Sequence, residues 1–93
     1  MITAFVLARV EPASLDLVAQ SIADGVANSE VFSVAGGDAD LIAIVRVESP
    51  EALKELVTRH LATIPGIRET RTSIAYREYS TTEMTTAYDV FGE

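Results

Sequence analysis

The sequence contains no cysteine and no tryptophan, and it has a single histidine, His60. The absence of cysteine excludes disulfides, thiolate catalysis and cysteine-ligated metals. One histidine allows neither a Ser-His-Asp grouping nor a metal-ligand spacing to be built around it. We therefore expect no metal site, no cofactor and no catalytic centre, and we expect His60 to pack against a sheet from the apolar side of its helix.

Basic residues are also scarce. There are 7 Lys and Arg residues against 14 Asp and Glu residues, which gives a formal net charge of −7. Proteins that bind DNA draw much of their affinity from Lys and Arg neutralising phosphates. Direct binding to nucleic acid is therefore not expected, and we interpret the acidic excess as a contribution to solubility.

Long apolar runs are absent as well. No stretch approaches the length of a membrane span, and Arg9 and Glu11 interrupt the apolar N-terminal segment, which has no basic region before it. The 93 residues, 48% of them hydrophobic, are enough for one small domain with a core. A cytoplasmic protein without membrane contact is the expectation.

The apolar residues that are present follow strand and helix periods. They predict strands over residues 2–10, 30–35, 40–48 and 67–79, and helices over about 14–25 and 50–64. Pro12 or Ser14 can open the first helix, Ser49 can cap the second, and Pro65-Gly66 stops it. The order βαββαβ predicts an α+β fold, the ferredoxin-like plait.

Both faces of the first and third predicted strands are apolar, and in this topology these strands form the central pair. Two helices cover one face of a four-stranded sheet and leave the other bare. Because monomers rarely expose a large apolar patch, the pattern predicts an obligate dimer in which two sheets pack face to face, a dimeric α/β barrel.

A short loop between the second and third predicted strands holds Gly36, Gly37, Asp38 and Asp40. The glycines permit positive φ and leave no Cβ in the way of an approaching group. The aspartates can hydrogen-bond the turn or accept from a ligand's ammonium group, and the two roles are compatible.

Thr70 and Thr72 lie on one face of the last predicted strand by its period of two. Threonine is an ordinary residue of an edge strand, and this alone would explain both positions. Their hydroxyl groups can also donate to and accept from a small polar ligand.

Two segments together, Gly37-Asp38-Ala39-Asp40 and residues 61–74, resemble the ligand-binding (effector) domain of Lrp/AsnC transcription regulators. The resemblance covers about residues 2–79, and we expect a domain over residues 1–79 with a C-terminal tail over 80–93. Family members usually carry a helix-turn-helix domain ahead of this module, whereas Met1 falls directly at the first strand. The resemblance therefore implies a stand-alone effector domain with a role in transcription regulation.

The resemblance also implies an assembly and a ligand. Such domains dimerise through their sheets, and dimers assemble into rings, commonly octamers, with mixed oligomers with full-length regulators as a further expectation. An amino acid or related small molecule binds in clefts between dimers. Carried onto this sequence, the ligand-facing positions are Gly36, Gly37, Asp38, Asp40, Thr70 and Thr72.

Two departures from the family pattern concern the pocket and the end of the chain. Ala39 stands where the family often has a bulky, commonly aromatic residue, which implies a wider pocket or a different specificity. The tail after Tyr79 runs beyond the family's usual end and could modify the assembly.

Two other functions remain open at this point. Dimeric plaits of this size include cofactor-free monooxygenases and isomerases, although His60 is the one side chain here that suggests such chemistry. A purely structural assembly subunit, with the Gly/Asp loop serving turn geometry alone, is the other alternative.

Overall fold

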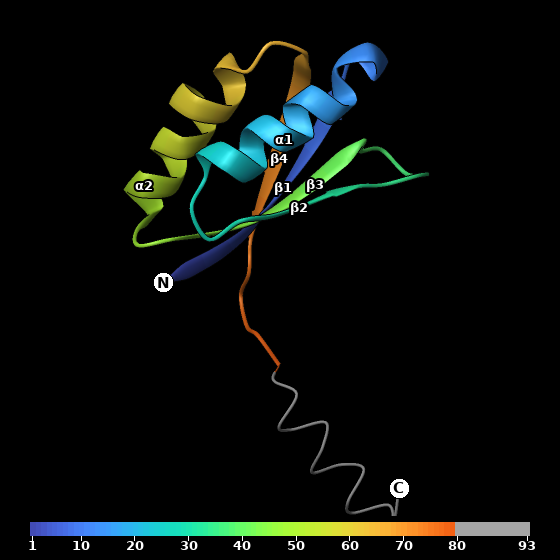
Figure 1. The fold of residues 1–93 in the computed structure, drawn as a ribbon. Helices are drawn as coiled ribbons and strands as arrows, with labels where there is room; N and C mark the ends of the chain where they lie inside the picture. Colours follow the sequence, from blue (N-terminus) through green and yellow to red (C-terminus); the bar gives the residue numbers. More distant parts are fainter. Residues whose placement is uncertain (80–93) are drawn as a thin grey trace, which may run out of the picture.

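The computed structural model describes residues 1–79. They form a four-stranded antiparallel sheet with two helical segments packed on one of its faces (Figure 1). The elements in chain order are β1 (Ile2–Val10), η1 (Pro12–Ser14), α1 (Leu15–Gly25), β2 (Glu30–Ser33), β3 (Leu41–Val47), α2 (Pro50–Glu55), η2 (Leu56–His60), η3 (Leu61–Thr63) and β4 (Ile67–Ile74). The α+β, ferredoxin-like fold predicted from the sequence is confirmed.

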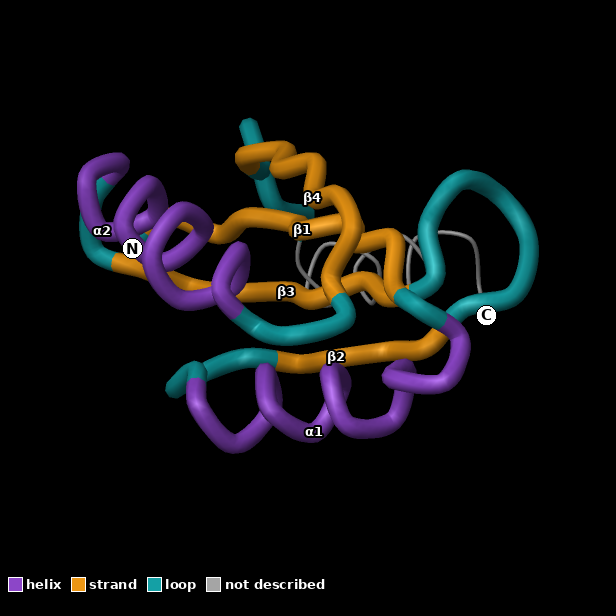
Figure 2. Tube along the Cα trace, turned by 90° about the horizontal axis from the view of Figure 1, so that it is seen from above, coloured by secondary structure: helices purple, strands orange, loops and turns teal. Residues whose placement is uncertain are grey.

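The strand order is β2-β3-β1-β4, so β1 and β3 form the central pair and β4 is an edge strand. All neighbours run antiparallel, with Val6 of β1 opposite Ala43 of β3 on one side and Thr72 of β4 on the other. Figure 2 shows the four strands side by side, with α1 lying along β2. The polar composition of residues 67–74 suits this edge position.

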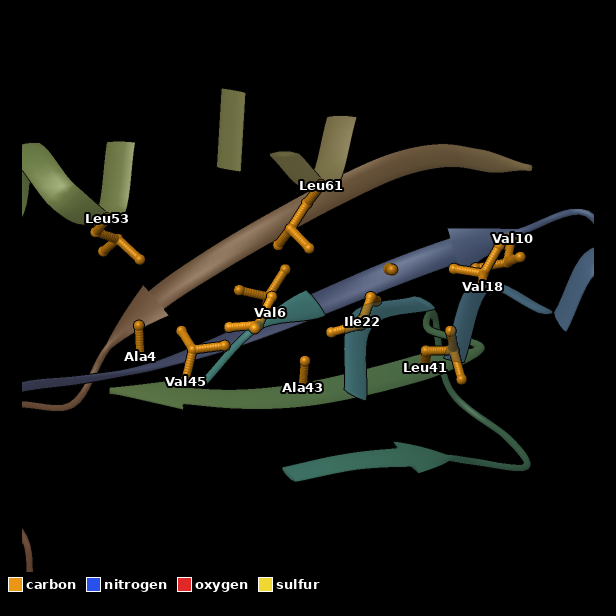
Figure 3. Close-up of a cluster of buried hydrophobic side chains, with 12 residues drawn as sticks. Ala4, Val6, Val10, Val18, Ile22, Leu41, Ala43, Val45, Leu53 and Leu61 are labelled. Atoms are coloured by element: carbon orange, nitrogen blue, oxygen red, sulfur yellow. The ribbon is translucent and has the colours of Figure 1, made fainter. Parts of the chain in front are cut away.

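The core lies between the helices and one face of the sheet. Every second residue of β1 and β3 is buried, and these residues pack against side chains of α1, α2 and η3. Figure 3 shows Val6 and Leu61 pointing toward one another across this layer. The core residues are Ala4, Val6, Ala8, Val10, Val18, Ile22, Val26, Leu41, Ala43, Val45, Leu53 and Leu61.

The helix boundaries follow local signals in the sequence. The hydroxyl of Ser49 accepts a hydrogen bond from the N–H of Ala52 at 3.1 Å, with Pro50 at the first helical position. Gly66 ends the second helical segment at φ +102°, and its carbonyl accepts from the N–H of Glu11 at 2.8 Å. The chain can therefore turn back into β4 at a point packed directly against the start of the first helix.

Three strand boundaries differ from the prediction. β2 ends at Ser33 rather than residue 35, β3 spans Leu41–Val47 rather than 40–48, and β4 ends at Ile74 rather than Tyr79. The β1–β4 ladder ends at the pair of Ala4 and Ile74, two residues short of the start of β1. The N–H of Ala75 still donates to the carbonyl of Thr3 at 2.8 Å, and the chain then leaves the sheet. The expected tail over residues 80–93 lies outside the described residues.

The prediction that His60 packs against the sheet is wrong. The segment η2 is π-helical, and the N–H of Leu61 donates to the carbonyl of Leu56 five residues before it. The wider turn rotates residue 60 off the inward stripe, and Leu61, with 0% of its surface exposed, takes the buried place. His60 is exposed, and its imidazole lies over Gly25, with Nε2 2.9 Å from the position that a Cβ there would occupy.

Candidate functional site

The loop between β2 and β3 projects beyond the end of the sheet (Figure 1). Its base is closed by the N–H of Val34, which donates to the carbonyl of Asp40 at 3.0 Å. The N–H of Asp40 in turn donates to the carbonyl of Ala8 at 2.9 Å, which ties the loop to β1. The loop is therefore anchored at one end of the central strand pair.

Gly36 and Gly37 adopt φ values of +89° and +77° at the loop tip. A Cβ built at either position would meet nothing within 4 Å, so neither glycine is needed for close packing in the isolated chain. Their role is to permit the backbone conformation, and the space around them is open to a ligand or a neighbouring subunit.

Asp40 has a structural role in this loop. Its Oδ2 accepts a hydrogen bond from the N–H of Val10 at 2.8 Å, beyond the last β1–β3 pair between Ala8 and Leu41. The carboxylate thus satisfies a backbone donor at the point where the strand ladder ends. Asp38 precedes β3 and lies exposed in the loop.

A hollow of about 360 Å³ lies beside this loop. This volume is at the small end of the range for small-molecule pockets. Three of its residues come from the loop, one from β1 and two from β4. The lining residues are Arg9, Gly37, Asp38, Asp40, Glu69 and Arg71.

The charged groups of this hollow are not equally engaged. Arg71 Nε lies 3.3 Å from Glu69 Oε1, and the Asp40 carboxylate is hydrogen-bonded to Val10. Within residues 1–79, Arg9 and Asp38 take part in no ion pair. The hollow therefore offers one guanidinium and one carboxylate that are free to meet a ligand.

Sequence reasoning missed Arg9, Glu69 and Arg71. Arg9 lies opposite Glu69 in the β1–β4 register, and Arg71 lies opposite Leu7, so all three side chains share the sheet face that the helices leave open. The signal that could have identified Arg9 is its position as the lone charge in an apolar strand. The two residues from β4, Glu69 and Arg71, reach the hollow because of the register between β4 and β1, and no local sequence pattern reveals that register.

The structure does not bring all the predicted site residues together. Thr70 and Thr72 pair with Ala8 and Val6, whose side chains are buried toward the helices, so both threonines lie on the opposite face of β4 from Arg71. Thr72 lines a separate hollow with residues of α2. Neither Gly36 nor Ala39 lines the hollow beside the loop.

Residues 1–79 contain neither a metal-binding cluster nor a membrane-spanning helix. No three His, Asp or Glu side chains in this part of the chain are grouped to hold a metal ion. No helix in the same residues has the length and hydrophobicity to cross a membrane.

Comparison with known proteins identifies the family. The model of the Lrp/AsnC ligand binding domain matches residues 3–85. The chain belongs to the Lrp/AsnC ligand-binding domain family. The match includes the loop of Gly37, Asp38 and Asp40 and all four strands.

Solved structures support the assignment. TTHA0845 from Thermus thermophilus is 39% identical over 86% of this chain and 99% of its own, with a TM-score of 0.77. FFRP-DM1 is 28% identical over 81% of this chain and 99% of its own, with a TM-score of 0.74. A comparison with curated proteins found no match.

Longer regulators share the Lrp/AsnC fold. AsnC of E. coli is 17% identical over 85% of this chain and 53% of its own, with a TM-score of 0.76. The regulator NMB0573 from Neisseria meningitidis was solved as an L-Met complex. It is 15% identical over 85% of this chain and 52% of its own, with a TM-score of 0.74. The chain therefore corresponds to about half of each of these two regulators.

Proposed function

We propose that this chain is an effector domain that binds an amino acid, or a closely related small zwitterion, in the hollow beside the β2–β3 loop. Its role is in transcription regulation in the cytoplasm, through assembly rather than through direct contact with DNA or through catalysis. Membership of the Lrp/AsnC ligand-binding family and the L-Met complex of NMB0573 support this class of function.

The observation that carries the proposal is that Arg9 and Asp38, which have opposite charges, both line the hollow. Within residues 1–79, these are the two charged side chains of the hollow that take part in neither an ion pair nor a hydrogen bond, whereas Asp40 is hydrogen-bonded to Val10 and Arg71 is paired with Glu69. An amino acid carries a carboxylate that suits the guanidinium of Arg9 and an ammonium that suits the carboxylate of Asp38. The hollow has a volume of about 360 Å³, and its two unengaged groups are one cation and one anion, which match a small zwitterion in charge and in size.

The other lining residues shape the hollow around Arg9 and Asp38. The hydrogen bond from Val10 to Asp40 fixes the end of the loop against β1, and Arg71 is oriented by Glu69. Gly37 leaves its backbone accessible at the tip, where an N–H can meet a carboxylate. The family resemblance implies that Asp40 contacts the ligand. We propose that Asp40 does so while its bond to Val10 positions the loop.

Thr70 and Thr72 enter the proposal from a neighbouring subunit. They face away from the hollow within their own chain, so they can contact a ligand bound beside the loop only across a subunit boundary. Gly36, at the open loop tip, is placed for the same boundary.

The assembly proposed is a homodimer that associates further, with an octamer as the expected ring and full-length Lrp/AsnC regulators as further partners. The dimer forms through the sheet face opposite the helices. In β1–β3 this face presents Phe5, Leu7, Ile42 and Ile44, and Phe32 of β2, 51% exposed, extends it. A second sheet would remove this apolar surface from water.

Calorimetric titration of the purified protein with each of the twenty amino acids tests the function. One or a few should bind to the wild type, and Asp38→Asn should weaken that binding. Asp16→Asn, which removes the same charge from the exposed start of α1, should leave it unchanged.

Three results of this titration would contradict the proposal. No binding by any amino acid would favour a structural assembly subunit. Equal affinity for wild type and Asp38→Asn would place the ligand elsewhere. Chemical turnover of a bound ligand would favour the enzyme alternative.

A further inference from the structure

The five residues after β4, Ala75–Tyr79, form an extended segment that we call the arm. Figure 1 shows this segment leaving the sheet and running away from the body of the domain. Among residues 1–79, the only backbone hydrogen bond between the arm and the body is donated by Ala75 to the carbonyl of Thr3 at 2.8 Å. The arm is therefore held at its root and extends free of its own sheet.

The arm and the residue before it are unusually apolar for such exposed positions. Ile74 is 55% exposed, Tyr76 is 103% exposed and Tyr79 is 71% exposed. These are three of the six large hydrophobic residues exposed in the described chain, and they fall within six consecutive positions. Aromatic side chains in this state contribute strongly to binding when a partner covers them.

A hollow of about 670 Å³ lies between the arm and β1. Its wall on the body is formed by Thr3 and Phe5, and the arm forms the rest. Phe5 pairs with Ile44 on the sheet face that the helices leave open, so the hollow is continuous with the proposed dimer surface. Whatever covers that face also reaches this hollow.

From these contacts we infer that the arm docks on a second copy of this chain. Each arm inserts Tyr76 and Tyr79 into the hollow beside Phe5 of its partner, and the exchange is reciprocal about a two-fold axis. This inference rests on the proposed sheet-to-sheet dimer and adds to it a second, exchanged contact. Because the arm and the hollow belong to the same chain, a two-fold axis can place each arm in the hollow of the other copy.

The charges of the arm agree with a two-fold arrangement. Arg77 and Glu78 are adjacent, and the Arg77 guanidinium lies 5.0 Å from the ring centre of Tyr79. Two arms running antiparallel would place each Arg77 near the partner's Glu78, so the pairing is neutral overall. A second copy therefore suits the arm in polarity and in charge.

The dimer dissociation constant, measured by analytical ultracentrifugation, tests the inference. The double variant Tyr76→Ser/Tyr79→Ser should dissociate with a constant raised about 10-fold or more, because aromatic anchors dominate interface energies. The control is Leu17→Ser, which removes a side chain 74% exposed on α1, away from the arm, and should leave the constant unchanged. Circular dichroism should show all three proteins folded, since the replaced side chains are exposed.

A second measurement uses the absence of tryptophan from the chain. Tyr76→Trp supplies a single indole, whose emission should be blue-shifted and shielded from iodide in the dimer. Both signals should become those of exposed indole on dilution below the dissociation constant. Shielding that persists on dilution would show that the arm is covered by its own chain, and would overturn the inference.

The remaining outcomes separate this inference from the proposed dimer. A dimeric wild type whose dissociation constant is unaffected by the double variant overturns the arm contact alone. A monomeric wild type at micromolar concentration overturns both, because no second copy is then present to hold the arm.

Discussion

The Oδ2 atom of Asp40 accepts the backbone N–H of Val10 at 2.8 Å. These residues are thirty positions apart, and their contact closes the end of the central strand pair while fixing the loop that carries the proposed binding hollow. One hydrogen bond thus contributes both to the stability of the sheet and to the placement of the proposed binding site. A residue at this position influences ligand binding through loop placement as well as through charge.

Replacing Asp40 with alanine should destabilise the protein by about 1–3 kcal/mol, because the N–H of Val10, a residue only 3% exposed, loses its acceptor. Asp40→Asn retains an amide oxygen that can accept the same bond, so its loss should be smaller. Urea unfolding of the two variants checks this ranking. An Asp40→Ala protein as stable as the wild type would show that the bond is replaced by water at no cost.

Gly66→Ala should destabilise the fold by about 2 kcal/mol or more. The φ of +102° is strained for alanine, and the new Cβ would lie 2.6 Å from Cβ of Ser14. Gly36→Ala is the matched control: its φ is +89° but nothing lies within 4 Å, so only the backbone cost of about 1 kcal/mol is expected. Equal losses in thermal or urea unfolding would contradict a packing role for Gly66.

Adding Ser14→Gly to Gly66→Ala should recover the part of the loss that comes from the Ser14 contact, and should leave the backbone strain and the 3.2 Å contact with Val18 Cγ2. A double-mutant cycle with the two single variants isolates this term. Strict additivity of the two changes would show that the Ser14 contact relaxes freely.

Asp38→Asn and Arg9→Gln should each weaken amino-acid binding by about 1–3 kcal/mol, a loss of about 5- to 150-fold, since each removes one charge-assisted contact. Arg59→Gln on the far helical segment is a charge-matched control for Arg9, with its guanidinium 3.8 Å from Glu55 and no contact with the hollow. Calorimetric titration provides the measurement. A loss as large in Arg59→Gln would indicate a general charge effect rather than a site.

Ile44 and Val45 are neighbours on opposite faces of β3 and should respond differently to a charge. Ile44→Glu should weaken the proposed dimer by about 3 kcal/mol or more, about 100-fold, and leave a folded monomer, because Ile44 lies on the open face beside Phe5. Val45→Glu should unfold the chain, because Val45 is 0% exposed inside the core.

Ultracentrifugation and circular dichroism together separate these two effects. A fully dimeric Ile44→Glu protein would exclude the open sheet face as the dimer surface. Unfolding of both variants would show that the sheet requires cover on both faces to fold.

The local signals of this sequence were sufficient for the fold. Ser49 and Pro50 mark the start of the second helix, Pro65-Gly66 marks its end, and alternating apolar residues mark the central strands, because each of these effects acts within a few residues. The fourth strand was predicted too long, because the chain leaves the sheet after Ala75 and no local pattern in the sequence marks that point. His60 was misplaced because a π-helical turn shifts the inward stripe by one residue.

The sequence predicted the loop residues of the binding hollow but not the residues that β1 and β4 contribute to it. The Gly/Asp loop is visible in the sequence as a turn with unusual backbone demands and spare acceptors. The partners of that loop in the hollow are decided by register: Arg9 faces Glu69, and Thr70 faces Ala8 on the other side of the sheet. Since one step along a strand exchanges the two faces, residues adjacent in sequence such as Thr70 and Arg71 belong to different surfaces, and only the pairing of distant strands reveals which is which.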